Sequence, residues 1–399
     1  MAFEDSSSLS RAVPLTRLAF RPLFLLASAF SVLALLVWLG FWHGVFVLEP
    51  HAGMLWWHQH EMLFGVVVAV IAGFLLTAVQ TWTGRRGLHG WPLVALVGLW
   101  LAARLLLAFP VAPAPWVAAL DVAFLVAVCG VMAHMIIAAK RWRNLVFLPV
   151  LAGLAGANLG SHLGVLNGDP ELVRQSSYFA VLLVVTVMAV LGGRVIPMFT
   201  ANRLGLTRKP PCRIAEGLAM GSLALAVLVQ LGVVLGGALP SWLLATLLGV
   251  AALSHPLRLA RWQGLAARRE PLLWSLHLSY AFIPLGLALW ALSLVGVGRT
   301  ELGIHALTVG AMGTMMLSMM ARVSLGHSGR PMRCLPGIGI ALALLVAAGL
   351  MRSVILALWP SITHWTYTLS ILAWCVGYTL FVVRYAGLLA SARPDGQAG

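Results

Sequence analysis

The chain has 399 residues, of which 61% are hydrophobic and only 9% are charged, and its formal net charge is +15. Soluble domains carry roughly 25% charged and about 45–50% apolar residues, so this composition excludes a soluble protein and predicts an integral membrane protein. The 26 Lys and Arg residues are scattered between apolar runs, so we expect no nucleic-acid partner. The four cysteines form no close pair, which indicates neither a disulfide framework nor attached c-type haem.

Twelve stretches of the chain are long enough to cross a bilayer, whose hydrocarbon core of about 30 Å needs roughly 20 apolar residues per helix. They lie near residues 22–47, 57–82, 91–109, 115–138, 144–166, 172–196, 213–235, 241–260, 271–296, 301–325, 337–358 and 364–389. We therefore expect an all-α polytopic bundle and a single transmembrane domain over residues 1–399. Its parts are an N-terminal segment over 1–21, a twelve-helix bundle over 22–389 and a tail over 390–399.

The basic residues indicate how these helices are oriented, because Lys and Arg collect in cytoplasmic loops. Twenty-two of them, Arg11 included, fall on one side of the twelve-span arrangement, and only Arg174 and Arg299 fall on the other. The remaining two lie within spans. We expect both termini in the cytoplasm and, in a bacterial cell, a location in the inner membrane.

Ionisable residues inside spans usually face a partner or a polar cavity. Arg104 and Asp121 have matching depths on one helical hairpin, which favours a structural ion pair, with binding of an anionic ligand as the alternative. Arg352 has no acidic residue nearby in sequence. It is a candidate counter-ion for a carboxylate such as a haem propionate, or a residue that snorkels or binds a backbone carbonyl.

Twelve histidines are many for so apolar a chain, and the predicted topology sorts several of them into layers. His58, His60, His162 and His305 fall at one shallow depth on the outer side. His134, His255, His277 and His327 form an inner layer. Imidazole suits Fe, Cu and Zn, and facing helices build metal sites in bundle cores. We expect a metal or haem site that uses at least two of the outer four, although a lone histidine in a span is more often a packing residue.

Helix geometry restricts how His58 and His60 can act. Two positions on a regular helix differ by about 200°, so both rings reach one centre only if the helix starts late or is distorted. Otherwise they serve two different partners. Glu61 shares the face of His58, so it is a candidate to orient a ligand imidazole or to handle protons.

Several strings in this sequence resemble the NnrS family. They are FRP at residues 20–22, WHQHEMLFG at 57–65, AGFLLTA at 72–78, WTGR at 82–85, GGRVIPMFT at 192–200, LHL at 276–278, HALTVG at 305–310 and ARVSLGHSGRP at 321–331. The resemblance extends over roughly residues 20–385, and the His-x-His-Glu string and the last string are its most specific parts.

The resemblance implies a polytopic inner-membrane protein that contains haem, of a type the sequence does not give, and copper. It implies a link to denitrification and to resistance against nitric oxide and nitrosative stress, with no settled reaction. Carried over by position, the family's motif residues are His58, His60, His277, His305 and His327, with Arg194, Arg322 and Arg330.

We therefore expect the metal ligands among His58, His60, His162, His277 and His305. The other candidate cofactor-binding residues are His327, Arg194, Arg322, Arg330 and Arg352, and Glu61 is the candidate catalytic residue. Candidate partners are nitric oxide or a related small ligand, the lipid bilayer and a respiratory electron donor.

Two other functions remain open. A twelve-helix carrier would have the same architecture, but residues 1–200 and 201–399 show no convincing similarity, and the layered histidines would be left unexplained. A metal-dependent assembly factor for another respiratory complex would show the same pigment without turnover of nitric oxide. A haem/copper oxidoreductase acting on nitric oxide is the first hypothesis.

Overall fold

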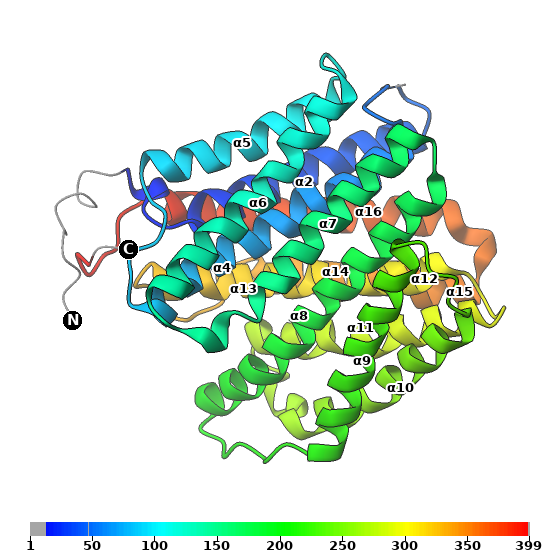
Figure 1. Ribbon diagram of the computed structural model, residues 1–399. Coiled ribbons are helices and arrows are strands. Elements are labelled where there is room, and N and C mark those ends of the chain that lie inside the picture. The colour runs from blue at the N-terminus through cyan, green and yellow to red at the C-terminus, as the bar shows by residue number, and fades with distance from the viewer. Residues whose placement is uncertain (1–12, 47, 398–399) are drawn as a thin grey trace. The chain divides into compact units, whose positions relative to one another are not determined.

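The computed structural model describes residues 13–46 and 48–397 (Figure 1). Arg11, most of the expected N-terminal segment and the last two residues of the tail lie outside this part of the chain. Every regular element within it is helical, and twelve helices are long and apolar enough to span a membrane. The predicted all-α polytopic fold is confirmed.

The spans follow from continuous apolar runs that end at Gly, Pro or polar residues. Their bounds are Phe20–Trp42, Met54–Thr83, Trp91–Ala108, Ala114–Ala138, Trp142–Asn167, Pro170–Leu204, Arg213–Val234, Ser241–Trp262, Pro271–Leu294, Thr300–His327, Ile338–Leu358 and Pro360–Ala390. One predicted end was wrong: the sixth span does not stop at residue 196 but continues through Pro197 to Leu204. Proline is tolerated inside membrane helices because neighbouring groups satisfy the freed backbone.

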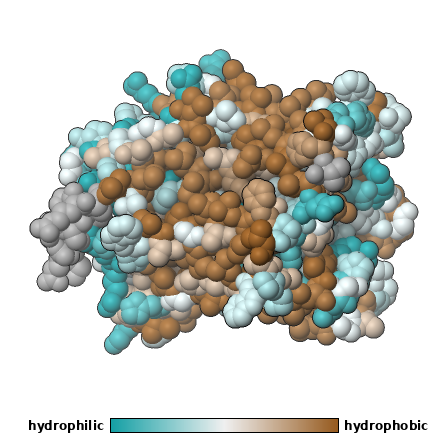
Figure 2. All heavy atoms as spheres, turned by 90° about the horizontal axis from the view of Figure 1, so that it is seen from above, coloured by the Kyte–Doolittle hydropathy of each residue, from teal (hydrophilic) through white to brown (hydrophobic). Residues whose placement is uncertain are grey.

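Large apolar side chains cover much of the molecular surface, as Figure 2 shows. Leu33, Trp116, Leu253 and Ile340 are among those more than half exposed. An apolar surface of this extent is typical of helices that face lipid.

Contacts divide the chain into two compact units. Unit 1 comprises Met1–Ser177, Met320–Arg333 and Phe381–Gly399, and unit 2 comprises Tyr178–Met319 and Cys334–Leu380. Unit 1 contains helices α2 (Phe20–Trp42), α3 (Met54–His60), α4 (Val68–Thr83), α5 (Trp91–Ala108), α6 (Ala114–Ala138) and α7 (Phe147–Asn167). Unit 2 contains α9 (Arg213–Val234), α10 (Ser241–Leu259), α11 (Pro271–Leu294), α12 (Thr300–His305) and α14 (Ile338–Leu350). Helices α8 (Pro170–Leu204), α13 (Thr314–His327) and α16 (Thr363–Ala390) have residues in both.

Three spans contain a π-helical segment: η2 (Glu61–Val67), η6 (Ala306–Gly313) and η7 (Met351–Ile355). A π segment winds more loosely than an α-helix, and such segments often occur at functional sites. The first follows His60 directly and the second follows His305 directly, while the third contains Arg352. Each interruption of the regular helix therefore lies at a residue that the sequence singled out.

The second and tenth spans repeat one pattern at a separation of 245 residues. In both, a short α-helix ends at a histidine, a π segment follows, and a longer α-helix ends near a left-handed glycine (φ 66° at Gly84 and 65° at Gly329). The matching pairs are His60 with His305, Gly65 with Gly310, Gly84 with Gly329 and Arg85 with Arg330. A comparison of residues 1–200 with 201–399 does not bring these pairs into register, because their separation is 245 residues.

Candidate metal centre

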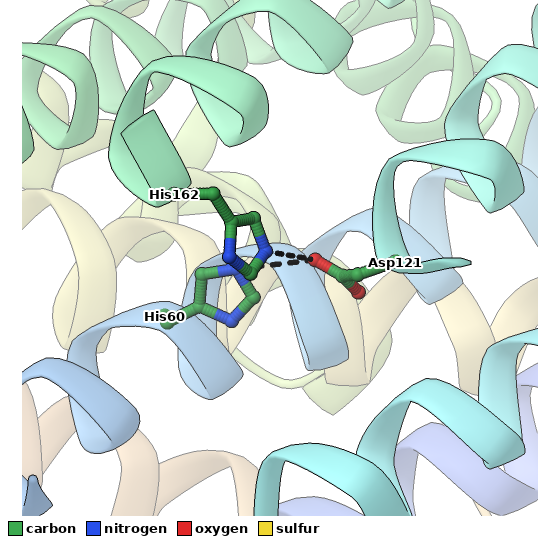
Figure 3. Close-up of side chains that lie close together, drawn as sticks. All are labelled: His60, Asp121 and His162. Carbon is green, nitrogen blue, oxygen red and sulfur yellow. Dashed lines mark hydrogen bonds and ion pairs between the residues drawn. The ribbon is translucent and has the colours of Figure 1, made fainter. Parts of the chain in front are cut away.

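Three buried side chains from three helices of unit 1 meet in Figure 3: His60 from α3, Asp121 from α6 and His162 from α7. The Asp121 Oδ2 atom lies 3.2 Å from His60 Nε2 and 3.1 Å from His162 Nε2. The three potential ligand atoms lie within 4.8 Å of one another. This is close enough for one ion to contact all three after a small adjustment.

Asn158, one turn before His162 on α7, completes the polar set. Its Nδ2 donates to Asp121 Oδ2 at 2.8 Å, and its Oδ1 lies 2.9 Å from His60 Nε2. The sequence analysis missed this residue. The signal was an amide four positions before a histidine in an otherwise apolar helix, which places both side chains on one face.

Aromatic rings fix the orientation of both histidines. Trp56 stacks on His60 with ring centroids 4.4 Å apart and presents an edge to His162 at 5.3 Å. Its indole N–H donates to Ser161 Oγ at 3.0 Å, so the indole itself is anchored. Nearby, outside the spans, burial lowers the pKa of His51, and the closeness of His60 lowers it further.

The charges around the site do not cancel. Arg104 on α5 donates to Asp121 Oδ1, and its Nη1 lies 3.0 Å from Glu61 Oε2. All three side chains are at most 4% exposed. The predicted pairing of Arg104 with Asp121 is confirmed, but one guanidinium faces two carboxylates. With both acids ionised and both histidines neutral, the cluster would carry one net negative charge in a buried site, where an uncompensated charge is costly.

The π segment η2 makes room for this ion pair. A Cβ at Gly65 would lie 2.5 Å from Glu61 Oε2 and 2.6 Å from Arg104 Nη1, so only glycine allows the pair to lie over the backbone. The carbonyl of Gly65 accepts a hydrogen bond from Trp100 Nε1 at 2.9 Å. The loosened helix therefore ties α5, which carries Arg104, to the segment that carries Glu61.

The donor set fits a borderline transition metal ion. Two imidazole nitrogens and one carboxylate oxygen suit divalent copper, iron or zinc. The Nδ1 atoms of His60 and His162 are buried without a hydrogen-bond partner. In the tautomer that carries the proton on Nδ1, both histidines turn an Nε2 lone pair toward Asp121. Glu61 Oε1 lies 3.8 Å from His60 Nδ1 and is near enough to orient that ring.

The other predicted site residues of unit 1 lie elsewhere. His58 stacks on Trp38 with centroids 4.4 Å apart, so His58 and His60 serve different partners, as their separation on a regular helix predicts. His327 lies beside Phe20, and its carbonyl accepts from Arg393. Arg330 donates to Ser391 Oγ, and Arg322 is buried.

The predicted residues of unit 2 do not all meet at one site. His305 and Arg352 contact each other, with Arg352 Nη2 2.5 Å from His305 Nε2. His277 Nε2 lies 3.0 Å from Thr200 Oγ1, and the backbone at Gly264 lies against its Nδ1. Arg194 is exposed.

Unit 2 also holds a buried cluster around His255, whose partners the sequence did not single out. His255 Nδ1 lies 2.7 Å from the hydroxyl of Tyr280, which also accepts from Arg258. Arg258 Nη2 in turn pairs with Glu216 at 2.9 Å. Here one guanidinium meets one carboxylate, so the cluster is electrically balanced without an added ion.

Comparison with known proteins agrees with the motifs. The family model described as NnrS protein matches residues 14–393, nearly the whole chain. The chain belongs to the NnrS family. Membership suggests a nitric-oxide-related membrane protein, and NnrS proteins are known in general for metal and haem binding. No curated protein matched this chain.

Proposed function

We propose that unit 1 binds a transition metal ion, copper or iron, through His60 Nε2, His162 Nε2 and Asp121 Oδ2, and that nitric oxide or a related small ligand binds to this metal. The observation that carries the proposal is three buried ligand atoms within 4.8 Å of one another, beside two carboxyl groups that share one guanidinium. A bound cation would balance the charge of the second carboxyl group when both acids are ionised, whereas a purely structural ion pair would need no second carboxylate.

The protein's own residues would prepare this site in distinct ways. Trp56 stacks on His60 and presents its edge to His162, Asn158 donates to Asp121, and Arg104 pairs with both Asp121 and Glu61. After a small shift, Glu61 Oε1, now 3.8 Å away, can accept a hydrogen bond from His60 Nδ1–H, which leaves the Nε2 lone pair for the metal. When bound, the metal supplies an open coordination position for a small ligand and one-electron redox chemistry.

Three further elements of the proposal rest on the family and on the sequence. Haem is the second proposed cofactor, and we assign it to no residue. His305 Nε2 faces a guanidinium and His277 Nε2 contacts Thr200 Oγ1, while His277 Nδ1 is buried without a hydrogen-bond partner among the described residues. The distribution of Lys and Arg supports an inner-membrane protein with both termini in the cytoplasm. A respiratory electron donor is the proposed redox partner.

The test is metal analysis with EPR spectra of the purified protein before and after addition of nitric oxide. Wild type should bind one equivalent of metal, and nitric oxide should change its spectrum. His162→Ala and Asp121→Asn should lose most of this metal. The matched control is His134→Ala, which removes an exposed histidine from α6, the helix that carries Asp121. Equal metal content in wild type and His162→Ala would contradict the proposal.

A carrier is the second candidate function, and the 245-residue repeat is the observation that favours it, because repeated helix units are common in transporters. Uptake of a substrate into vesicles that is unaffected by His162→Ala would support it. An assembly factor would instead show metal without a response to nitric oxide, and its deletion would leave a partner enzyme inactive.

A further inference from the structure

The repeated pattern extends to the helix that follows each histidine span. In unit 1, Trp100 of α5 contacts Gly65, and Arg104 lies four positions further on. In unit 2, Gly349 of α14 packs so closely that an added Cβ would lie 2.5 Å from Gly310 Cα. Arg352 lies three positions after Gly349. Each unit thus places an arginine against the segment where a histidine precedes a π turn.

His305 and Arg352 are held in a defined arrangement. His305 Nδ1 lies 2.7 Å from the carbonyl of Glu301 and therefore carries the proton that it donates. Its Nε2 is then an acceptor and faces Arg352 Nη2 at 2.5 Å. On the other side, the guanidinium lies over the ring of Tyr367, with Cζ 3.4 Å from the ring centroid. A neutral histidine thus positions the arginine.

The charge balance of this pair is opposite to that of the metal centre. Arg352 is buried, with an exposed fraction of only 7%. No carboxylate of the described residues forms an ion pair with it. Glu301, the nearest acid in sequence to His305, is half-exposed and pairs with Arg299, and it is near enough to Arg352 to interact with it electrostatically. The position that matches Glu61 is occupied by Ala306. With neutral His305, Arg352 is the buried charge of this pair, and Glu301 balances it only from a half-exposed position.

One nitrogen of Arg352 remains available. Its Nη1 is buried and has no hydrogen-bond partner among the described residues. A buried guanidinium with a free nitrogen is costly unless a partner accepts from it. Guanidinium matches planar anions that offer two acceptor oxygens. The site is reachable, because His305 is only half-buried and lies five positions after Thr300, where α12 begins.

We propose that His305 and Arg352 form an anion-binding site, which accepts a planar monoanion with two acceptor oxygens, of the nitrite or carboxylate class. Arg352 supplies the charge and the free donor, and His305 is a positioning residue that fixes the guanidinium. A carboxylate at this site can be a free anion or a substituent of a larger ligand such as a haem propionate. The inference stands apart from the metal proposal, because it uses no residue of unit 1.

The first test is thermal unfolding of the full-length purified protein in detergent, at constant ionic strength, with nitrite, formate or chloride. Nitrite and formate should raise the Tm of wild type with saturation, because a ligand that binds only the folded state stabilises it, and chloride should not. Arg352→Gln should reduce the affinity by about tenfold or more, and Arg352→Lys should retain part of it. Arg174→Gln, at an exposed arginine of α8 that pairs with Glu171, is the matched control.

Two further variants separate binding from misfolding. Arg352→Met removes the unpaired charge and should be at least as stable as wild type without anion, yet show no shift with nitrite. His305→Gln keeps an acceptor for Arg352 and should retain binding, whereas His305→Ala should lose it. Equal shifts in wild type and Arg352→Met, or equal shifts with chloride and nitrite, would overturn the site for free anions.

The propionate source is tested by haem content, read from the absorbance of protein purified from haem-supplied cells. If the anion is a haem substituent, haem per protein should fall severalfold in Arg352→Gln and stay unchanged in Arg174→Gln, with no nitrite shift in either. If neither the nitrite shift nor the haem content depends on Arg352, the proposal is wrong. Metal content measured in the same samples reports separately on His60 and His162, so the two proposals fail independently.

Discussion

The second and tenth spans share a backbone pattern but differ in charge. In unit 1, His60 is followed by Glu61, and Arg104 faces two carboxylates, which leaves one negative charge in excess. In unit 2, His305 is followed by Ala306, and Arg352 faces no carboxylate partner among the described residues. The same helix interruption therefore supports a site for a cation in one unit and a site for an anion in the other. The side chains placed on the pattern, rather than the pattern itself, decide the ligand.

The same substitution at the two arginines should have opposite effects, and this is the largest difference we expect. Arg104→Met leaves Glu61 and Asp121 buried without a counter-charge and should lower the free energy of unfolding by about 3–5 kcal/mol. Arg352→Met removes a lone charge and should leave stability equal or higher. Thermal unfolding of both variants in detergent checks this, and equal destabilisation of the two would remove the charge contrast between the units.

The glycines at matching positions should separate packing from metal binding. Gly65→Ala displaces the pair of Glu61 and Arg104, so it should cost about 1–3 kcal/mol of stability and reduce bound metal. Gly310→Ala drives a Cβ against the ring of Phe282, 2.5 Å from its Cγ, and should cost a similar amount while metal content is unchanged.

The control for both glycine variants is Gly98→Ala on α5, where an added Cβ meets nothing within 4 Å. It should be neutral or stabilising by roughly 0.5–1 kcal/mol. Full metal content in Gly65→Ala would show that the ion pair over η2 does not support the metal ligands.

Giving unit 2 the acid of unit 1 should abolish its anion site. Ala306→Glu places a carboxylate at the position that matches Glu61, where it can pair with Arg352. The affinity for nitrite, measured from the rise in Tm, should then fall by at least about tenfold, which corresponds to about 1.4 kcal/mol of binding free energy. Ala306→Gln, with the same shape and no charge, should retain more of the shift. If the two variants behave alike, steric change rather than charge controls binding.

The smallest expected effect concerns the hydrogen bond that holds α5 against η2. Trp100→Phe removes the donor to the Gly65 carbonyl and should lower the free energy of unfolding by about 1 kcal/mol, with a slight loss of metal. Trp91→Phe, at an indole that is 83% exposed, is the control and should have no effect. If Trp100→Phe bound less metal than Gly65→Ala, Trp100 would have a larger role than holding α5 against η2.

Much of the fold was predictable because lipid imposes a simple condition on the sequence. A helix must satisfy its own backbone and present about 20 apolar residues to cross the bilayer, so twelve apolar runs predict twelve spans. The predicted end of α8 was wrong because Pro197 lies inside this membrane helix, whereas a proline normally ends a helix of a soluble protein. The 245-residue repeat was missed because only four residues of the pattern are identical in its two copies, whereas its helix and π boundaries are visible only in the structure.

The sequence by itself determined the class of protein and the family, because hydrophobicity and motif identity are local properties of the chain, and it predicted a depth for several histidines. It named His60 and His162 among four histidines of one depth, but depth does not tell which helices are neighbours. Only the tertiary structure brought both against Asp121, added Asn158, and placed His305 with Arg352. It also decided the charge balance of each site, since a net charge belongs to the side chains that meet and not to any one segment.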